Sequence, residues 1–248
     1  MANPGAYALL RVALLATITA ISHPIILIGQ AEAPLSIPEK RQPSEADRLI
    51  IKRQIAPVMS VAHADWLTRP ERDREEQPGL VVRALKISKG DTVVDLGAGV
   101  GYFTWRLSKA VGPDGRVLAV DIQQGMIDRL KQNLTKRRIH NVEAILADEE
   151  DPHLPVGEVD LVLAVDVYHE LQQPQKTVWH VRRSLKPGWR FVLVEYRKED
   201  PEIPIHPLHK MTVKQARSEL EAMGFRLVQL LNFLPRQHIL IFEDSVSH

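Results

Sequence analysis

The sequence predicts an α/β fold with a doubly wound, mostly parallel sheet of seven strands that ends in an antiparallel hairpin. One observation is that apolar runs with strand composition alternate with amphipathic helical segments between residues 78 and 196. Strands joined through helices in this way lie parallel, because the crossover connection is right-handed. A second observation is that only Pro235-Arg236-Gln237 joins the last two strand candidates, a link too short for a parallel pair.

Seven runs have the composition of strands, because they are short, apolar and rich in β-branched residues. The clearest is Val159–Val165, whose nearly continuous apolar sequence is typical of a strand covered on both faces. In chain order the predicted strands are 92–96, 116–122, 142–147, 159–166, 190–196, 225–234 and 238–243.

Helices are predicted between the strands by apolar residues at helical spacing and by residues that start or stop helices. Pro174 stands in the first turn of a helix that Lys186-Pro187-Gly188 ends. Thr212 and Gln215 form a capping-box pattern that opens the last helix, and Gly224 closes it. The predicted helices are 78–85, 100–111, 124–137, 174–185 and 212–224.

Composition limits the classes of function. The chain of 248 residues is long enough for one ample α/β domain and a short additional segment. Its 32 basic and 31 acidic side chains nearly balance, so no basic field indicates nucleic acid as a partner. The sequence has no cysteine, which excludes disulfides, thiolate metal sites and a cysteine nucleophile.

Residues 1–31 are predicted to be a signal peptide or a membrane anchor. The apolar run from Val12 to Gly29 follows a single charge, Arg11, and small residues surround Ala31. This layout is typical of a secretory signal, so we expect an exported, periplasmic protein. The alternative is membrane association through an uncleaved anchor at residues 12–29, which the following basic residues would orient with the main domain in the cytoplasm.

Residues 32–77 are predicted to be a linker followed by a helical segment. Three prolines stand among polar residues between positions 34 and 43, which is typical of a linker. Ser44 is a candidate N-cap for a helix that follows. The stretch from Trp66 to Pro78 is dense in charges of both signs, which is typical of a solvated face.

A strand, a glycine turn and a helix form a small-molecule binding element at the first predicted strand. Asp95 stands at the end of that strand, and Gly97, Gly99 and Gly101 precede the helix. Glycines let the chain turn tightly and let a ligand approach the backbone, while the helix start presents free N–H groups to it. A dinucleotide fingerprint requires its third glycine where Tyr102 stands, so this spacing disfavours that interpretation.

The order Asp95-x-Gly97-x-Gly99-x-Gly101 resembles the first motif of the class I methyltransferases that depend on S-adenosylmethionine (SAM). The terminal hairpin extends the resemblance to about residues 78–243, because this family ends its seven-stranded sheet with an antiparallel pair. The chain is similar to a bacterial group that often carries export signals. The resemblance implies that residues 78–248 form a SAM-dependent methyltransferase domain, with SAM as cofactor and a small molecule as methyl acceptor.

The resemblance also implies roles for residues at the ends of the strands. The glycine turn and Asp95 would hold the amino-acid end of SAM, Asp121 would accept both ribose hydroxyls, and Asp148 would accept the adenine amino group. Glu149 is the nearest rival of Asp148. The implied cofactor-binding residues are Asp95, Gly97, Ala98, Gly99, Gly101, Asp121, Ile122, Met126, Asp148, Glu149 and Asp166. Because the family often folds a preceding segment over the cofactor, Trp66 and Arg69 are lid candidates.

Candidate catalytic residues follow the fourth predicted strand, in the run from Asp166 to Glu170. Methyl transfer needs the acceptor in line with the methyl group, and a base when the acceptor carries a proton. His169 is the first candidate base because its ordinary pKa suits that role, and Tyr168 is a candidate acceptor contact. Asp166 and Glu170 are the alternatives. The run lacks the N/D-P-P-Y motif of amino-directed DNA methyltransferases, which disfavours a nucleic-acid acceptor.

Candidate acceptor-binding residues follow the fifth predicted strand. Glu195 and Tyr196 end that strand, and His206 and His209 lie in the long proline-rich loop after it, where loops commonly cover an acceptor. The H-x-x-H spacing of the two histidines also suits a metal, but no helix sets their register, so we predict no metal site.

Two other functions stay open. One is an NAD(P)-dependent oxidoreductase on a Rossmann sheet, which the glycine spacing and the terminal hairpin disfavour. The other is an exported binding protein that retains the fold without catalysis, which the complete set of glycines and strand-end acids disfavours. The sequence gives no indication of the oligomeric state.

Overall fold

The computed structural model describes residue 51 and residues 53–245. The predicted signal peptide or anchor at 1–31 and most of the predicted linker lie outside these residues, so they stay predictions. Among the described residues, no helix combines the length and the apolar character that a membrane span requires.

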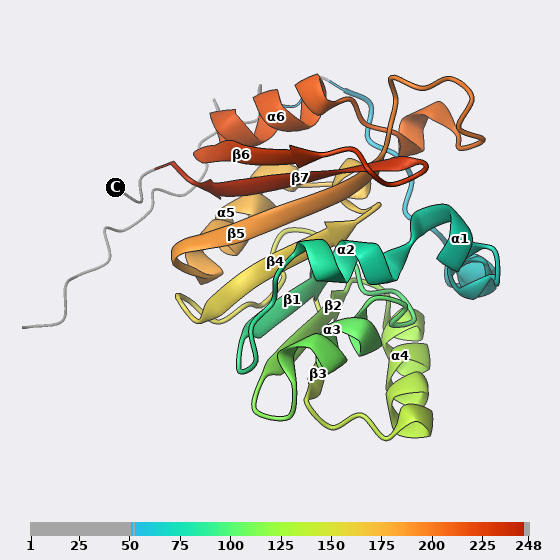
Figure 1. The fold of residues 1–248 in the computed structure, drawn as a ribbon, viewed down its shortest axis with the longest axis vertical. Coiled ribbons are helices and arrows are strands. Elements are labelled where there is room, and N and C mark those ends of the chain that lie inside the picture. Colours follow the sequence, from blue (N-terminus) through green and yellow to red (C-terminus); the bar gives the residue numbers. More distant parts are fainter. Residues whose placement is uncertain (1–50, 52, 246–248) are drawn as a thin grey trace, which may run out of the picture. The chain divides into compact units, whose positions relative to one another are not determined.

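Seven strands form one sheet in the order β3-β2-β1-β4-β5-β7-β6 (Figure 1). The first five pair in parallel, and β7 runs antiparallel between β5 and β6, which confirms the predicted fold class. The strands are β1 (Thr92–Leu96), β2 (Arg116–Asp121), β3 (Val142–Leu146), β4 (Val159–Val165), β5 (Leu185–Tyr196), β6 (Phe225–Leu231) and β7 (Gln237–Asp244).

Helices connect the parallel strands and cover both faces of the sheet. The helices of the sheet region are α2 (Pro78–Ala84), α3 (Thr104–Val111), α4 (Gln124–Arg137), α5 (Pro174–Ser184) and α6 (Val213–Ala222). Before them come a 3₁₀ helix, η2 (Val61–Thr68), and a short helix, α1 (Arg72–Glu76). Two further 3₁₀ turns, η3 (Tyr168–Glu170) and η4 (Pro207–His209), follow β4 and β5. The capping box predicted at Thr212 opens α6.

Two elements begin away from their predicted positions, whereas the other predicted bounds agree to within three residues. β5 begins at Leu185 because this residue pairs with Val159 of β4, after which the register between the two strands shifts. α3 begins only at Thr104, because Gly101 in the preceding turn has a φ of +90°, outside the helical region.

The core is divided by the sheet into two layers. On one face, apolar side chains of α5 and α6 pack against alternate residues of the central strands. On the other face, α2 and α3 cover the alternate strand residues that point to that side, and α4 packs over β2. Every residue of β4 is buried, as its apolar sequence predicts. The covered sheet leaves the loops at the carboxyl ends of its parallel strands as the place for a ligand.

We expect Phe242→Ala to lower the free energy of unfolding by about 3–5 kcal/mol, because it leaves a cavity in the core on β7. The same substitution at Phe233, which is 48% exposed, is the matched control and should cost about 0.5 kcal/mol or less. Urea unfolding followed by circular dichroism measures both. Equal losses for the two variants would contradict the position of Phe242 in the core.

Candidate functional site

A cavity of about 350 Å³ lies at the carboxyl ends of the parallel strands, within the size range of small-molecule sites. The glycine turn, the ends of β2 and β4, and η4 all contribute to its lining. Most of the residues predicted to form the site line this one cavity. They are Asp95, Gly97, Ala98, Gly99, Asp121, Ile122, Met126, Asp148, Glu149, Asp166, His169, Tyr196, His206 and His209.

Three predicted site residues do not line the cavity. Gly101 instead packs toward α4, where an added Cβ would lie 2.5 Å from Leu130 Cδ1. Tyr168 is fully buried in the core, and its hydroxyl donates to Glu219 Oε2 at 2.9 Å. The structure therefore corrects the prediction of Tyr168 as an acceptor contact. Glu195 lies behind His169 and acts on the site through that residue.

Hydrogen bonds connect the glycine turn to the end of β2. The N–H groups of Gly97 and Ala98 both donate to the carbonyl oxygen of Val120, at 2.8 Å each. Asp121 Oδ2 accepts from Gly99 N, and its Oδ1 accepts from Gln123 N, each at 2.9 Å. Burial raises the pKa of Asp121, although these backbone N–H donors oppose the rise. Each carboxylate oxygen still has a lone pair for a ligand hydroxyl.

Close packing makes glycine necessary at the start of the turn. Gly97 has a φ of +72°, and a Cβ there would lie 2.3 Å from Val167 Cγ2. The loop after β4 thus rests directly on the turn after β1. This contact brings the two loops together along one wall of the cavity.

Asp95 is buried at the end of β1 and lines the same cavity. Its Oδ2 accepts a hydrogen bond from Thr104 Oγ1 at 2.6 Å. Burial raises the pKa of Asp95 to about 6, against the opposing effects of Thr104 and the positive charge of Arg72. The carboxylate is thus largely ionised at pH 7 and available to a cationic group.

His169 is held by a buried carboxylate. Its Nδ1 lies 2.6 Å from Glu195 Oε2, and the other Glu195 oxygen accepts from Tyr168 N at 3.0 Å. Burial lowers the pKa of His169, but the negative charge of Glu195 outweighs it and the pKa is raised overall. Glu195 therefore fixes both the ring and the backbone of η3.

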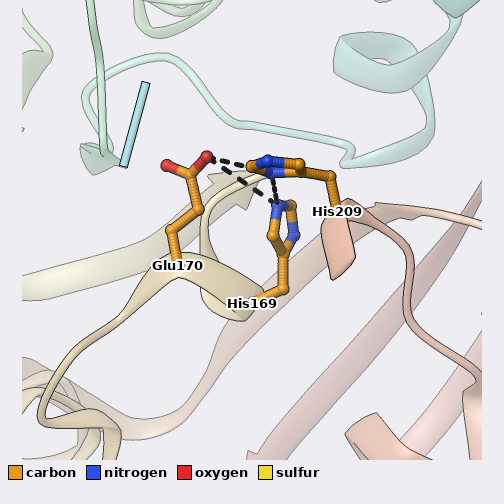
Figure 2. Close-up of side chains that lie close together, drawn as sticks. All are labelled: His169, Glu170 and His209. Atoms are coloured by element: carbon orange, nitrogen blue, oxygen red, sulfur yellow. Dashed lines mark hydrogen bonds and ion pairs between the residues drawn. The ribbon is translucent and has the colours of Figure 1, made fainter. Parts of the chain in front are cut away.

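Figure 2 shows that Glu170 of η3 and His209 of η4 turn toward His169. His169 Nε2 lies 3.1 Å from His209 Nδ1, which lies 3.2 Å from Glu170 Oε1. Burial raises the pKa of Glu170 to about 7, and burial lowers the pKa of His209. The other loop histidine, His206, accepts from Leu208 N through its Nδ1 and so caps η4.

Asp166 lies near Glu195 and contacts Gln237, the first residue of β7. It is half-buried with a φ of +54°, and its Oδ2 accepts from Gln237 Nε2 at 2.7 Å. Burial raises its pKa well above the ordinary value, and the charges of Glu76 and Glu195 add to the rise. Among the described residues its Oδ1 has no hydrogen-bond partner, and Asp166 lines the wall of the cavity.

Sequence reasoning missed the buried part of the charged segment before β1. Arg72 and Glu76 of α1 form a buried ion pair at 2.7 Å, and the Tyr196 hydroxyl donates to Glu76 at 2.9 Å. Their i,i+4 spacing was a visible signal, although such pairs usually lie on exposed helix faces. Of the two lid candidates, Trp66 lines the cavity, and the Arg69 guanidinium lies 3.6 Å from the centre of its ring.

Comparisons with known proteins agree with this geometry. The sequence model of a family described as a methyltransferase domain matches residues 87–232, more than half of the chain. The crystal structure of a SAM-dependent methyltransferase from Aquifex aeolicus superposes with a TM-score of 0.71 at 25% identity, covering 75% of this chain and 98% of that one.

Two curated relatives are similar at the sequence level. An arsenite methyltransferase from Halobacterium salinarum is 30% identical over 156 residues, which cover 58% of this chain and 39% of the relative. A ubiquinone/menaquinone biosynthesis C-methyltransferase from Francisella tularensis subsp. novicida is 30% identical over 120 residues, 48% of this chain and 47% of the relative. The matches span less than half the length of these relatives. Family match, sheet order and glycine motif agree: the chain belongs to the methyltransferase domain family, as a class I SAM-dependent methyltransferase.

Proposed function

We propose that the protein transfers a methyl group from SAM to a small-molecule acceptor. The observation that carries this proposal is one cavity with two chemically different ends. We call the part of the lining formed by the glycine turn, Asp95 and Asp121 the first end, and the part formed by His169, Glu170 and His209, which Figure 2 shows together, the second end or acceptor end. A cofactor and an acceptor can meet within such a cavity, as methyl transfer requires.

The residues of the first end fit the parts of SAM. Asp95 would attract the amino group of the methionine end, and Asp121 would accept the ribose hydroxyls through its remaining lone pairs. Ile122 is an apolar side chain left 38% exposed on the cavity wall, which suits the face of an adenine ring. Met126 lines the wall nearby, and Asp148 and Glu149 are the acceptors proposed for the adenine amino group.

The second end fits a reacting group that carries a proton. Methyl transfer is an in-line displacement at a sulfonium, so the protein's main tasks are to align the acceptor and to provide for its proton. His169 lines the cavity with its ring held by Glu195, and we propose it as the proton acceptor, with Asp166, Tyr196, His206 and His209 as neighbours of the acceptor. The two curated relatives are named as an arsenite and a ubiquinone/menaquinone methyltransferase, which supports a small-molecule acceptor here.

Two alternatives are distinguishable from this proposal. An NAD(P)-dependent oxidoreductase would bind a nicotinamide dinucleotide, and the family match favours SAM instead. A non-catalytic binding protein would bind SAM without consuming it. Formation of S-adenosylhomocysteine with a panel of oxygen, sulfur and arsenic acceptors separates catalysis from binding alone.

We expect Asp121→Ala to weaken SAM binding by about 100-fold, because two charge-assisted hydrogen bonds to ribose are lost. Calorimetric titration of the purified protein with SAM measures this change. Asp128→Ala is the matched control, because Asp128 lies on the exposed side of α4 outside the cavity. Binding of NAD in place of SAM, or equal SAM affinity of the Asp121→Ala and Asp128→Ala variants, would contradict the proposed cofactor site.

We expect the affinity for SAM to fall as the pH is lowered from about 7.5 to about 5. Asp95 has a pKa of about 6, so below that value its carboxylate must first lose a proton to attract the SAM ammonium. The dissociation constant should then rise by up to about tenfold per pH unit. Titrations at several pH values should show a flatter curve for Asp95→Asn. An unchanged curve for that variant would exclude Asp95 as the titrating group.

A further inference from the structure

Three potential metal ligands converge at the acceptor end of the cavity from two separate loops. His169 and Glu170 lie on η3 after β4, and His209 lies on η4 after β5 (Figure 2). Their ligand atoms all lie within 4.8 Å of one another. The H-x-x-H pair considered from the sequence is not this group, because the partner of His209 is His169, forty residues earlier in the chain.

The distances fit a bound ion. His169 Nε2, His209 Nδ1 and Glu170 Oε1 are separated by 3.1, 3.2 and 3.9 Å. The point equidistant from three atoms so placed lies about 2 Å from each, which is the length of a Zn–N or Zn–O bond. We propose that these three side chains bind a divalent transition-metal ion, with Zn²⁺ as the best fit, beside the methyl acceptor.

Hydrogen bonds among the three ligand atoms leave at least one of their lone pairs without a donor. The bond from His169 Nδ1 to Glu195 leaves Nε2 of the neutral ring as an acceptor. The ionised Glu170 Oε1 is also an acceptor, and both lie within 3.2 Å of His209 Nδ1, which offers them one proton in one tautomer of its ring and none in the other. A cation at the centre would satisfy the lone pairs of all three atoms at once.

The surrounding residues have the arrangement that commonly supports a metal-bound histidine. Such a ring usually donates its second nitrogen to a carboxylate, which fixes its orientation, and Glu195 is that carboxylate here. The backbone of the segment is also held, because Arg53 donates to the carbonyl oxygens of His169 at 2.9 Å and Tyr168 at 3.1 Å. The His169 ligand is thus positioned without the ion.

The chemistry of the ligand set indicates what the ion would do. Two imidazoles and one carboxylate suit Zn²⁺ and other divalent first-row ions, and three protein ligands leave a position open. All three side chains line the cavity, so the open position is accessible to an acceptor hydroxyl or thiol. Coordination lowers the pKa of such a group.

This inference rests on the proposed function, because the ion would meet the acceptor in the same cavity. The acceptor loses its proton to solvent, and its oxygen or sulfur electron pair forms the new bond to the methyl carbon. The methyl–sulfur bond of SAM breaks with its electrons on sulfur, which gives S-adenosylhomocysteine. In the metal-bound protein His169 is a ligand of the ion. The role of His169 as a base, proposed above, applies only to the protein without the ion.

The test is a titration of the chelator-treated protein with Co²⁺, whose visible absorption reports nitrogen and oxygen ligands, followed by competition with Zn²⁺. We expect one Co²⁺ per chain, displaced by one Zn²⁺. Affinity should fall by more than about 100-fold in His209→Ala and by about 10–100-fold in Glu195→Gln. His140→Ala is the matched control, because His140 is an exposed histidine outside the cavity.

Each outcome separates the metal site from the proposed function. His209 has a side chain 30% exposed, so its replacement should leave the fold intact, which circular dichroism checks. SAM binding without stoichiometric Co²⁺ binding overturns the metal site alone, as does a Co²⁺ site that survives His209→Ala. Stoichiometric Co²⁺ binding that His209→Ala abolishes, in a protein that does not bind SAM, supports the metal site and overturns the proposed function.

Discussion

The part of the cavity proposed to hold the acceptor depends on the carboxylate of Glu195. It is fully buried where β5 ends, and its two oxygens hold the Tyr168 backbone and the His169 ring. A buried carboxylate without partners costs several kcal/mol, so both contacts are strongly favoured. The sheet therefore sets the position of the imidazole, although His169 itself belongs to the loop after β4. The same carboxylate would hold His169 equally well as the proposed base and as the proposed metal ligand.

A second buried charge joins the N-terminal part of the described chain to the sheet. Arg72 and Glu76 of α1 pair with each other, and Glu76 also accepts from the Tyr196 hydroxyl at the end of β5. Loss of one member would leave a charge uncompensated in the interior. The segment before β1 is thereby part of the cavity wall, on which Trp66 is also found. Buried carboxylates thus hold both His169 and the segment before β1 in place.

The sequence predicted the sheet well because burial leaves a regular pattern. β4 is buried throughout and apolar except for Asp160, and α4 has the predicted bounds. Side-chain direction within short irregular segments was not predictable. Tyr168 and His169 are neighbours in η3, yet only the histidine lines the cavity, because Glu219, far along the chain on α6, binds the tyrosine hydroxyl. The convergence of His209 with His169 was likewise invisible, since it depends on the packing of two loops.

The division of the cavity among strands has an evolutionary consequence. The proposed cofactor contacts come mainly from the loops after β1, β2 and β3, whereas the histidines and Glu170 come from the loops after β4 and β5. Insertions or exchanges in the latter two loops therefore alter one half of the cavity while Asp121 still fastens the glycine turn to β2. A common cofactor-binding half can in this way be inherited unchanged while acceptor preference diversifies, loop by loop, among descendants of one ancestor.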